Sequence, residues 1–332
     1  MKRIAALFLI FCMLFALAAC GNTTPPVEES KTPPVEESNT PPVEDSATPP
    51  TEENTVPAID KDREGNSITL PAQIEKVMSF GPSNSEILVA LGQGDKLIAV
   101  DTYSTNIEGL PADLPQFDMM TPDAEQIVSL KPDVIFITGM SKLMGEDDPY
   151  KSIKDTGGCV IYIPSSESID AIKEDIQFIA DVMGQSAAGG EIVSTMEKEI
   201  EAVKKIGDTI TDKKKVYVEI SAAPYMYSFG SGVFMHELLE LIGAENVLAD
   251  QQSWISVSDE VVLSKNPDVI LTTVNYVDDP TGEIMSRAGW DAVTAVANEE
   301  VYQVSTDATN RPSQNITKAL QEMAKVIYPD KY

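Results

Sequence analysis

The chain has 332 residues, with 53 acidic against 24 basic side chains and a formal net charge of −29. A chain this acidic is a poor partner for nucleic-acid backbones and anionic membrane surfaces, so we expect no nucleic-acid partner. One histidine and three cysteines leave little material for acid–base or covalent catalysis, and the single histidine argues against a zinc or manganese site.

Residues 1–19 have the pattern of a lipoprotein signal peptide. Lys2 and Arg3 precede the apolar run Ile4–Leu17, which is too short to span a membrane as a helix. The run ends in Leu-Ala-Ala-Cys-Gly, so we expect Cys20 to carry lipid and to anchor the chain outside the cell. An ordinary secretory signal or a short membrane anchor is the alternative.

Residues 20–58 are predicted to form a spacer between the lipid and the folded part. The motif Thr-Pro-Pro, followed by acidic residues, recurs with a period of eight from residues 24, 32, 40 and 48. Proline fixes φ and the acidic side chains repel one another, so the segment should be extended and solvated. Cys12 leaves with the signal and Cys20 is expected to carry lipid, so Cys159 has no cysteine to pair with in the mature chain. We expect it to be a small buried apolar residue.

Apolar runs alternate with helical patterns along the rest of the chain. This alternation predicts an α/β fold with two Rossmann-like lobes and mostly parallel sheets. A long amphipathic helix, Glu191–Ile206, has no strand attached. The predicted strands are Val77–Phe80, Leu97–Val100, Val134–Ile137, Val160–Ile163, Val216–Ile220, Val269–Leu271 and Val301–Val304, and the other predicted helices are Ser83–Leu91, Ala124–Leu130, Ser168–Met183, Met235–Ile242, Ser258–Ser264 and Ser313–Ile327.

An internal repeat indicates that the lobes are similar. Residues 125–138 align without gaps on residues 260–273, with half of the positions identical, and residues 86–92 align more weakly on residues 237–243. Each strong unit is a short helix, a Pro-Asp turn and a buried strand, and the Asp is expected to bond its own backbone. We therefore predict an N-terminal lobe at 59–185, an interlobe helix at 186–210 and a C-terminal lobe at 211–332.

Two lobes imply a cleft, and in α/β sheets ligands lie off the carboxyl ends of the strands. The residues that follow the predicted strands are therefore candidates for ligand contact. They are Gly81 to Asn84, Asp101 to Tyr103, Tyr225 to Tyr227, Asn275, Tyr276, Asp307 and Arg311.

Five segments, in order, resemble one known family. They are Ser79–Glu86, Leu130–Asp133, Trp254 with Val257–Glu260, Asn266–Asp268, and Arg311 with Pro312. They are similar to the Fe(III)-siderophore, haem and cobalamin class of periplasmic binding proteins, which serve ABC importers, and the resemblance covers residues 76–332. It implies that the long helix joins the lobes rigidly and that the chain is a monomer that delivers a small molecule to a permease dimer with its ATPase.

The same resemblance implies a docking role for Glu125 and Glu260. In that family one glutamate on each lobe tip docks against arginines of the permease. First-turn glutamates that interact with the helix dipole are the plainer interpretation.

Three ligands fit the resemblance, and an iron complex is the first. An anionic Fe(III) chelate would meet Arg311 as a fixed donor fork. Its flat parts would be covered by Tyr103, Tyr225, Tyr227 and Trp254. The alternative for Arg311 is a surface ion pair with Asp307, four residues earlier.

Haem and cobalamin are the other two candidates. Met119 and Met120 resemble the stretch that supplies an axial methionine to haem, with Met120 at the ligand position, whereas Asn275 stands where the axial histidine would fall; Tyr276 beside it is a substitute. The alternative for Met120 is an apolar contact in the cleft wall. Cobalamin is held by aromatics at positions like Tyr103 and Trp254, but Met119 and Thr138 stand where some cobalamin binders carry tryptophan.

A transport binding protein is thus the leading interpretation, and we expect no enzyme and no intrinsic cofactor. The chain has no Gly-x-Ser-x-Gly, His-Glu-x-x-His, P-loop or Cys-x-x-Cys motif. The single histidine, His236, is expected to face solvent or cap a helix. A surface adhesin or structural lipoprotein is the alternative from another class, because the spacer resembles a stalk.

Overall fold

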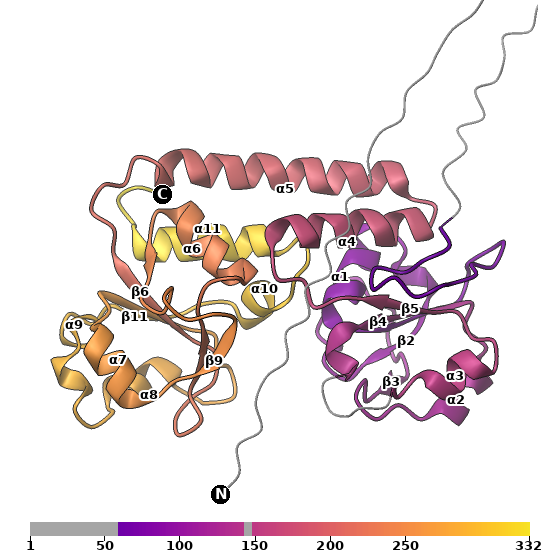
Figure 1. Ribbon diagram of the computed structural model, residues 1–332, viewed down its shortest axis with the longest axis horizontal. Coiled ribbons are helices and arrows are strands. Elements are labelled where there is room, and N and C mark those ends of the chain that lie inside the picture. The colour runs from indigo at the N-terminus through magenta and orange to yellow at the C-terminus, as the bar shows by residue number, and fades with distance from the viewer. Residues whose placement is uncertain (1–58, 143–147) are drawn as a thin grey trace, which may run out of the picture. The chain divides into compact units, whose positions relative to one another are not determined.

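The computed structural model describes residues 59–142 and 148–332, which are drawn in colour in Figure 1. The predicted signal peptide, Cys20 and the whole predicted spacer lie outside the described residues. Within them, no helix is long and apolar enough to cross a membrane. The description below concerns the folded unit that ends at Tyr332.

The N-terminal lobe is built on a five-stranded parallel sheet of order β3-β2-β1-β4-β5. Every residue of β1 and β4 is buried, because helices cover both faces of this sheet and leave no solvent-facing side to the central strands. The strands are β1 Val77–Phe80, β2 Leu97–Asp101, β3 Gln116–Phe117, β4 Val134–Thr138 and β5 Val160–Ile163.

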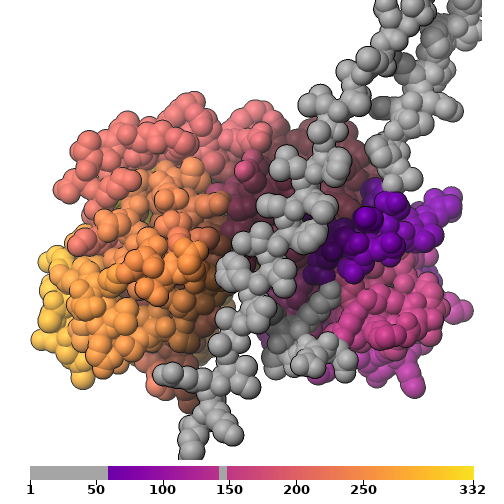
Figure 2. All heavy atoms as spheres, in the orientation of Figure 1, coloured from indigo at the N-terminus to yellow at the C-terminus, as the bar shows by residue number. Residues whose placement is uncertain are grey.

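The C-terminal lobe has a second parallel sheet, of order β11-β10-β6-β8, and a small antiparallel pair, β7-β9. The two lobes lie on either side of Figure 1, below α5, and in Figure 2 the orange to yellow atoms of the C-terminal lobe and the indigo to magenta atoms of the N-terminal lobe lie on opposite sides. The predicted two-lobed α/β architecture with parallel sheets is confirmed. The strands are β6 Lys215–Glu219, β7 Tyr227–Phe229, β8 Glu245–Asn246, β9 Trp254–Ser256, β10 Val269–Thr272 and β11 Val301–Gln303.

The helices follow the strands closely in sequence, as the alternating pattern predicts. In the N-terminal lobe they are α1 Pro82–Ala90, α2 Ala124–Leu130, α3 Lys151–Asp155 and α4 Ile169–Val182, with short 3₁₀ turns at Gly94–Lys96 and Gly139–Lys142. In the C-terminal lobe they are α6 Phe234–Ile242, α7 Asp259–Lys265, α8 Pro280–Met285, α9 Thr294–Ala297, α10 Thr306–Asn310 and α11 Ile316–Ile327, with a 3₁₀ turn at Trp290–Ala292.

The long helix α5, Ser186–Gly207, begins five residues before the predicted range. It packs against α4 of the N-terminal lobe and against α6 and α11 of the C-terminal lobe, and Figure 1 shows it running above both. Gly189 lets α4 approach, because a Cβ there would lie 2.4 Å from that of Ala180. A Cβ on Gly207 would lie 2.2 Å from the Leu241 carbonyl oxygen. Glycines are weak helix formers, which is why the sequence pattern missed the first turn.

The internal repeat has the same geometry in both lobes. Lys131 and Asn266, at the equivalent C-caps of α2 and α7, both have a left-handed backbone. The Asp of each Pro-Asp turn was expected to bond its own backbone, and this expectation is wrong. Asp133 accepts hydrogen bonds from the backbone of Glu75 and Lys76, and Asp268 accepts one from Lys215, each at the start of the neighbouring strand. The Asp therefore joins its turn to the next strand of the sheet.

Candidate functional site

The carboxyl ends of β1 and β2 are joined by one buried carboxylate, that of Asp101. It accepts hydrogen bonds from the backbone N–H groups of Gly81 (3.0 Å) and Tyr103 (2.8 Å) and from the hydroxyl of Ser104. Burial raises the pKa of Asp101, and these hydrogen bonds oppose the rise. Asp101 thus fixes the loops that carry the candidate residues of the N-terminal lobe.

Arg311 connects these loops to the C-terminal lobe. Its Nη2 donates to the carbonyl oxygen of Tyr103 and to Oδ1 of Asn106, both at 3.0 Å, and it lies 2.8 Å from Asp307 Oδ1. Asn106 also donates to Asp307 Oδ2 at 2.6 Å. The predicted ion pair of Arg311 with Asp307 is present, but its position is between the lobes, and the Arg311 side chain is only 13 % exposed.

The other side of the Arg311 guanidinium meets Glu86 of α1. Arg311 Nη1 lies 2.9 Å from Glu86 Oε1, while Glu86 Oε2 accepts from Asn315 Nδ2 at 2.8 Å and from the Ser313 hydroxyl. Glu86 is 6 % exposed, and among residues 59–142 and 148–332 its side chain bonds only to residues of the other lobe. The segments after β1 and β2 therefore meet those after β11, so the carboxyl edges of the two sheets face each other. We call this contact the Glu86–Arg311 junction.

Glu86 is a functional candidate that sequence reasoning missed. The motif that contains it was used for the family resemblance, but no role was given to its carboxylate. The available signal was its place in Asn-Ser-Glu-Ile-Leu, where a carboxylate lies among the residues that α1 buries. A buried carboxylate requires partners, so this position predicted a polar contact from elsewhere in the chain.

Exposed tyrosines lie on segments of both lobes, and one of them, Tyr103, bonds to Arg311 through its carbonyl oxygen. Tyr103 is 62 % exposed, Tyr225 84 % and Tyr276 65 %, whereas Tyr227 is only just exposed. The Tyr276 hydroxyl accepts a hydrogen bond from the backbone of Ala222 at 2.9 Å, which joins the loops after β10 and β6. Large exposed aromatics on such loops are typical of a surface that covers a flat ligand.

The other aromatic and methionine candidates lie deeper. Trp254 is half-buried on β9, where its ring meets that of Phe229 edge-on, with 5.9 Å between centroids. Met119 is packed in the core of the N-terminal lobe and its carbonyl accepts from the buried Tyr150 hydroxyl at 2.9 Å. Met120 is half-buried beside it. Met119 therefore does not face the junction, whereas Met120 retains some exposure.

A second arginine cluster lies within the C-terminal lobe. The buried Arg287 binds Glu219, at the carboxyl end of β6, with contacts of 2.7 and 2.9 Å, and it also pairs with Glu283. Burial raises the pKa of Glu219, although the hydrogen bonds and positive charge of Arg287 act to lower it. Burial also works to lower the pKa of Arg287, but the hydrogen bonds and charges of both glutamates outweigh it and raise this pKa. Both arginines near the strand ends are thus paired with two carboxylates each.

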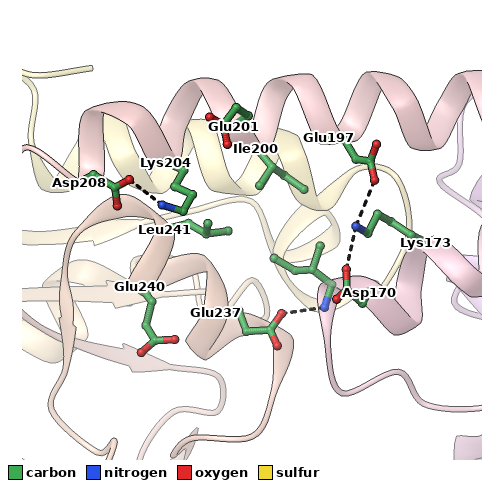
Figure 3. A pocket seen from close by; sticks show the side chains of 11 residues that line it. Asp170, Lys173, Glu197, Ile200, Glu201, Lys204, Asp208, Glu237, Glu240 and Leu241 are labelled. Atoms are coloured by element: carbon green, nitrogen blue, oxygen red, sulfur yellow. Dashed lines mark hydrogen bonds and ion pairs between the residues drawn. The ribbon is translucent and has the colours of Figure 1, made fainter.

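A groove of about 600 Å³ lies under α5 and is lined by residues of α4, α5 and α6, none of which belongs to the junction (Figure 3). Glu237 of α6 reaches across it and accepts the backbone N–H of Ile169, at the start of α4, at 2.8 Å. Burial raises the pKa of Glu237, and the nearby Asp170 and Glu240 add to the rise. The groove thus contains the second glutamate that bridges the lobes.

The two docking candidates are exposed, whereas His236 is not. Glu125 and Glu260 are exposed in the first turns of α2 and α7, and Figure 1 shows both helices on the side of their lobes away from α5. A hydrogen bond from Ser258 lowers the pKa of Glu260. His236 was expected to face solvent or to cap a helix, and this expectation is wrong: its side chain is 13 % exposed, and Val233 holds the N-cap position of α6. The ring lies beside Asn246 and 3.5 Å from Glu240. The part of the chain that the structure describes contains no cluster of three His, Cys, Asp or Glu side chains suited to a metal ion.

Comparison with known proteins identifies the family. The family model for periplasmic binding proteins matches residues 77–308. This chain belongs to the periplasmic binding protein family. It is 30 % identical over 276 residues to the uncharacterized ABC transporter substrate-binding lipoprotein YvrC of Bacillus subtilis, covering 82 % of this chain and 85 % of YvrC. The predicted family is therefore confirmed.

Other similar proteins differ in the ligands that their names give. A cobalamin-binding protein of Halobacterium salinarum is 24 % identical over 285 residues, covering 81 % of this chain and 73 % of that protein. A crystal structure of a possible iron-binding, periplasmic solute-binding protein of Staphylococcus epidermidis superposes with a TM-score of 0.68 at 28 % identity, covering 77 % of this chain and 99 % of that one. The chain is an extracytoplasmic substrate-binding protein of an ABC transporter, and its relatives are solute-binding proteins.

Proposed function

We propose that this chain is a lipid-anchored binding protein, without catalytic activity, that captures a corrinoid of the cobalamin type and delivers it to its permease. The choice of ligand rests on one observation: both lobes expose tyrosines, while Arg287 and Arg311 are each already paired with two carboxylates. A large, flat, uncharged macrocycle needs stacking surfaces and little cationic charge. The similarity to a cobalamin-binding protein supports the same choice.

An anionic iron chelate, our first expectation, has less support because it depended on Arg311. That guanidinium is bonded to Glu86, Asp307, Asn106 and the Tyr103 carbonyl, so its donor fork is occupied. Displacing Glu86, the buried acceptor, would leave its carboxylate without the guanidinium, and an unsatisfied buried polar group costs about 1–3 kcal/mol.

Haem is also less well supported. Its two propionates would need cations, and its iron would need an axial ligand. The Tyr276 hydroxyl is held by Ala222 and lies 3.2 Å from the Ser221 hydroxyl, and Met120 is half-buried. Binding haem through Tyr276 would require this contact between the β6 and β10 loops to break.

Docking to the permease is assigned to Glu125 and Glu260. Their helices occupy equivalent places in the repeat and both lie on the side away from α5, so one membrane protein can contact both. Exposed charges of this kind orient a complex and speed its formation more than they add affinity. The lipid on Cys20 would keep the chain beside the membrane.

Titration calorimetry tests the ligand. Cyanocobalamin is expected to bind at one site, to stabilise the chain by about 2.7 kcal/mol at a free concentration of 100 Kd, and to be recovered unchanged. Haem and a ferric tricatecholate are expected to bind more weakly. Tyr103→Ala should weaken cyanocobalamin binding, while the matched Tyr103→Phe, which keeps the ring, should not. Tighter binding of either iron complex than of cyanocobalamin would overturn the ligand assignment.

A further inference from the structure

The Glu86–Arg311 junction carries more negative than positive charge. Glu86 and Asp307 contribute two carboxylates against the single guanidinium of Arg311, which leaves a formal charge of −1. An arginine at the base of a binding cleft normally serves to attract anionic groups. Here the surrounding carboxylates reverse the sign that a ligand would meet.

The distribution of exposure reinforces this reversal. The Arg311 side chain is largely buried, whereas the Asp307 side chain is 41 % exposed. Arg311 uses Nη1 for Glu86 and shares Nη2 among three acceptors, so the guanidinium offers few free N–H groups. A ligand that reaches the junction therefore meets a carboxylate before it meets the arginine.

We propose that Glu86 is a specificity-determining residue that excludes anionic ligands. Because Glu86 also pairs with Arg311 from the buried side, the one guanidinium cannot offset both carboxylates, and the net negative charge lies beside the exposed Asp307. This inference deepens the proposed function and rests on it, since it takes the junction as the floor of the ligand cleft. It assigns the ligand to a chemical class, namely neutral or cationic molecules.

The chain itself supplies a matched control for Glu86. Glu237 occupies the position of α6 that aligns with Glu86 in the weaker repeat, and it too reaches the other lobe, through the Ile169 backbone. It lines the groove under α5 (Figure 3), and none of the residues that line this groove belongs to the junction. Glu237→Gln removes the same charge from an equivalent bridging residue, but without releasing an arginine.

The experiment measures how Glu86→Gln changes the affinity for an anionic and an uncharged macrocycle. Haem, with its two propionates, and cyanocobalamin are the probes, titrated against the whole mature chain at low and high salt. Glu86→Gln is expected to tighten haem binding about tenfold at low salt, because one opposing charge is gone, and to change the cyanocobalamin affinity much less. The gain should shrink as salt screens the remaining charges.

Two further variants make every result decisive. Asp307→Asn removes the exposed charge without touching Glu86, so it should tighten haem binding in the same direction even if Glu86→Gln does not fold. Glu237→Gln should leave the ratio of the two affinities unchanged. Equal haem affinities in the parent, Glu86→Gln and Asp307→Asn chains would overturn this inference, whether or not cyanocobalamin binds. Tighter haem binding by both junction variants, with no cyanocobalamin binding by the parent, would keep this inference and remove the corrinoid assignment.

Discussion

The two lobes carry two pairs of equivalent glutamates. The pair at the lobe tips has similar surroundings in both lobes, whereas the pair that bridges the lobes does not. Glu125 and Glu260 are both exposed at the first turn of a tip helix. Glu86 and Glu237 both cross to the opposite lobe, but Glu86 meets an arginine, a serine and an asparagine, whereas Glu237 accepts one backbone N–H. The two exposed tip glutamates can keep the same role if one permease contacts both. The surroundings of each bridging glutamate instead depend on the groups that the opposite lobe places against it.

The largest difference is expected in stability. Glu86→Ala should lower the free energy of unfolding by about 3 kcal/mol, because it leaves the guanidinium of Arg311 with less compensation and removes the acceptor of Ser313 and Asn315. Glu237→Ala removes one hydrogen bond and should cost about 1 kcal/mol or less. Urea unfolding with an unchanged m-value measures both. If both variants lost the same free energy of unfolding, the partners of Glu86 would stabilise the fold no more than those of Glu237.

The fold was largely predictable because its signals are local. Fully apolar strands such as Val134–Thr138 and the repeated Pro-Asp turns identify the sheets and the two lobes without any long-range information. The two- and three-residue strands β3, β7, β8 and β9 were missed because so few residues show no period. The α8 helix, Pro280–Met285, was missed for the same reason.

The candidate site was predictable only where its contacts are close in sequence. The spacing of four residues between Asp307 and Arg311 predicted their ion pair, which has an N–O distance of 2.8 Å. Glu86 is 225 residues from Arg311, so no periodicity or spacing rule could join them. Arg311 was interpreted as a free donor fork because the sequence could indicate its nearby partner, Asp307, but not its distant partner, Glu86.

Transport should separate the tip glutamates from the bridging ones. Glu125→Ala and Glu260→Ala are each expected to reduce uptake to a similar degree, and the double variant by about tenfold, with ligand affinity unchanged. Glu201→Ala, on α5 and thus on the other side of the molecule, is the matched loss of an exposed glutamate and should have no effect. Uptake that survives the double variant would remove the docking role.

The smallest expected effect concerns the pH dependence of Glu237. Burial, together with the charges of Asp170 and Glu240, raises the pKa of Glu237 in the folded chain, against the hydrogen bond from Ile169 and the charge of His236. The folded state therefore binds its proton more readily than the unfolded state, so the contribution of Glu237 to stability is greatest below the unfolded pKa of about 4.3. It is lost as the pH rises through the folded pKa, by at most about 1.4 kcal/mol for each unit of displacement. Solvent in the open groove should reduce this further.

Unfolding of the parent chain and of Glu237→Gln between pH 4 and pH 7 measures that contribution by difference. The stability of the parent chain relative to Glu237→Gln should fall as the pH rises, because only the parent has a carboxyl group at this position to ionise. A difference that grows with pH would mean that the carboxylate of Glu237 is stabilised on folding. In that case the surroundings of Glu237 would stabilise its carboxylate, as Arg311 does for Glu86. The two bridging glutamates would then be equivalent in their stabilisation as well as in their position.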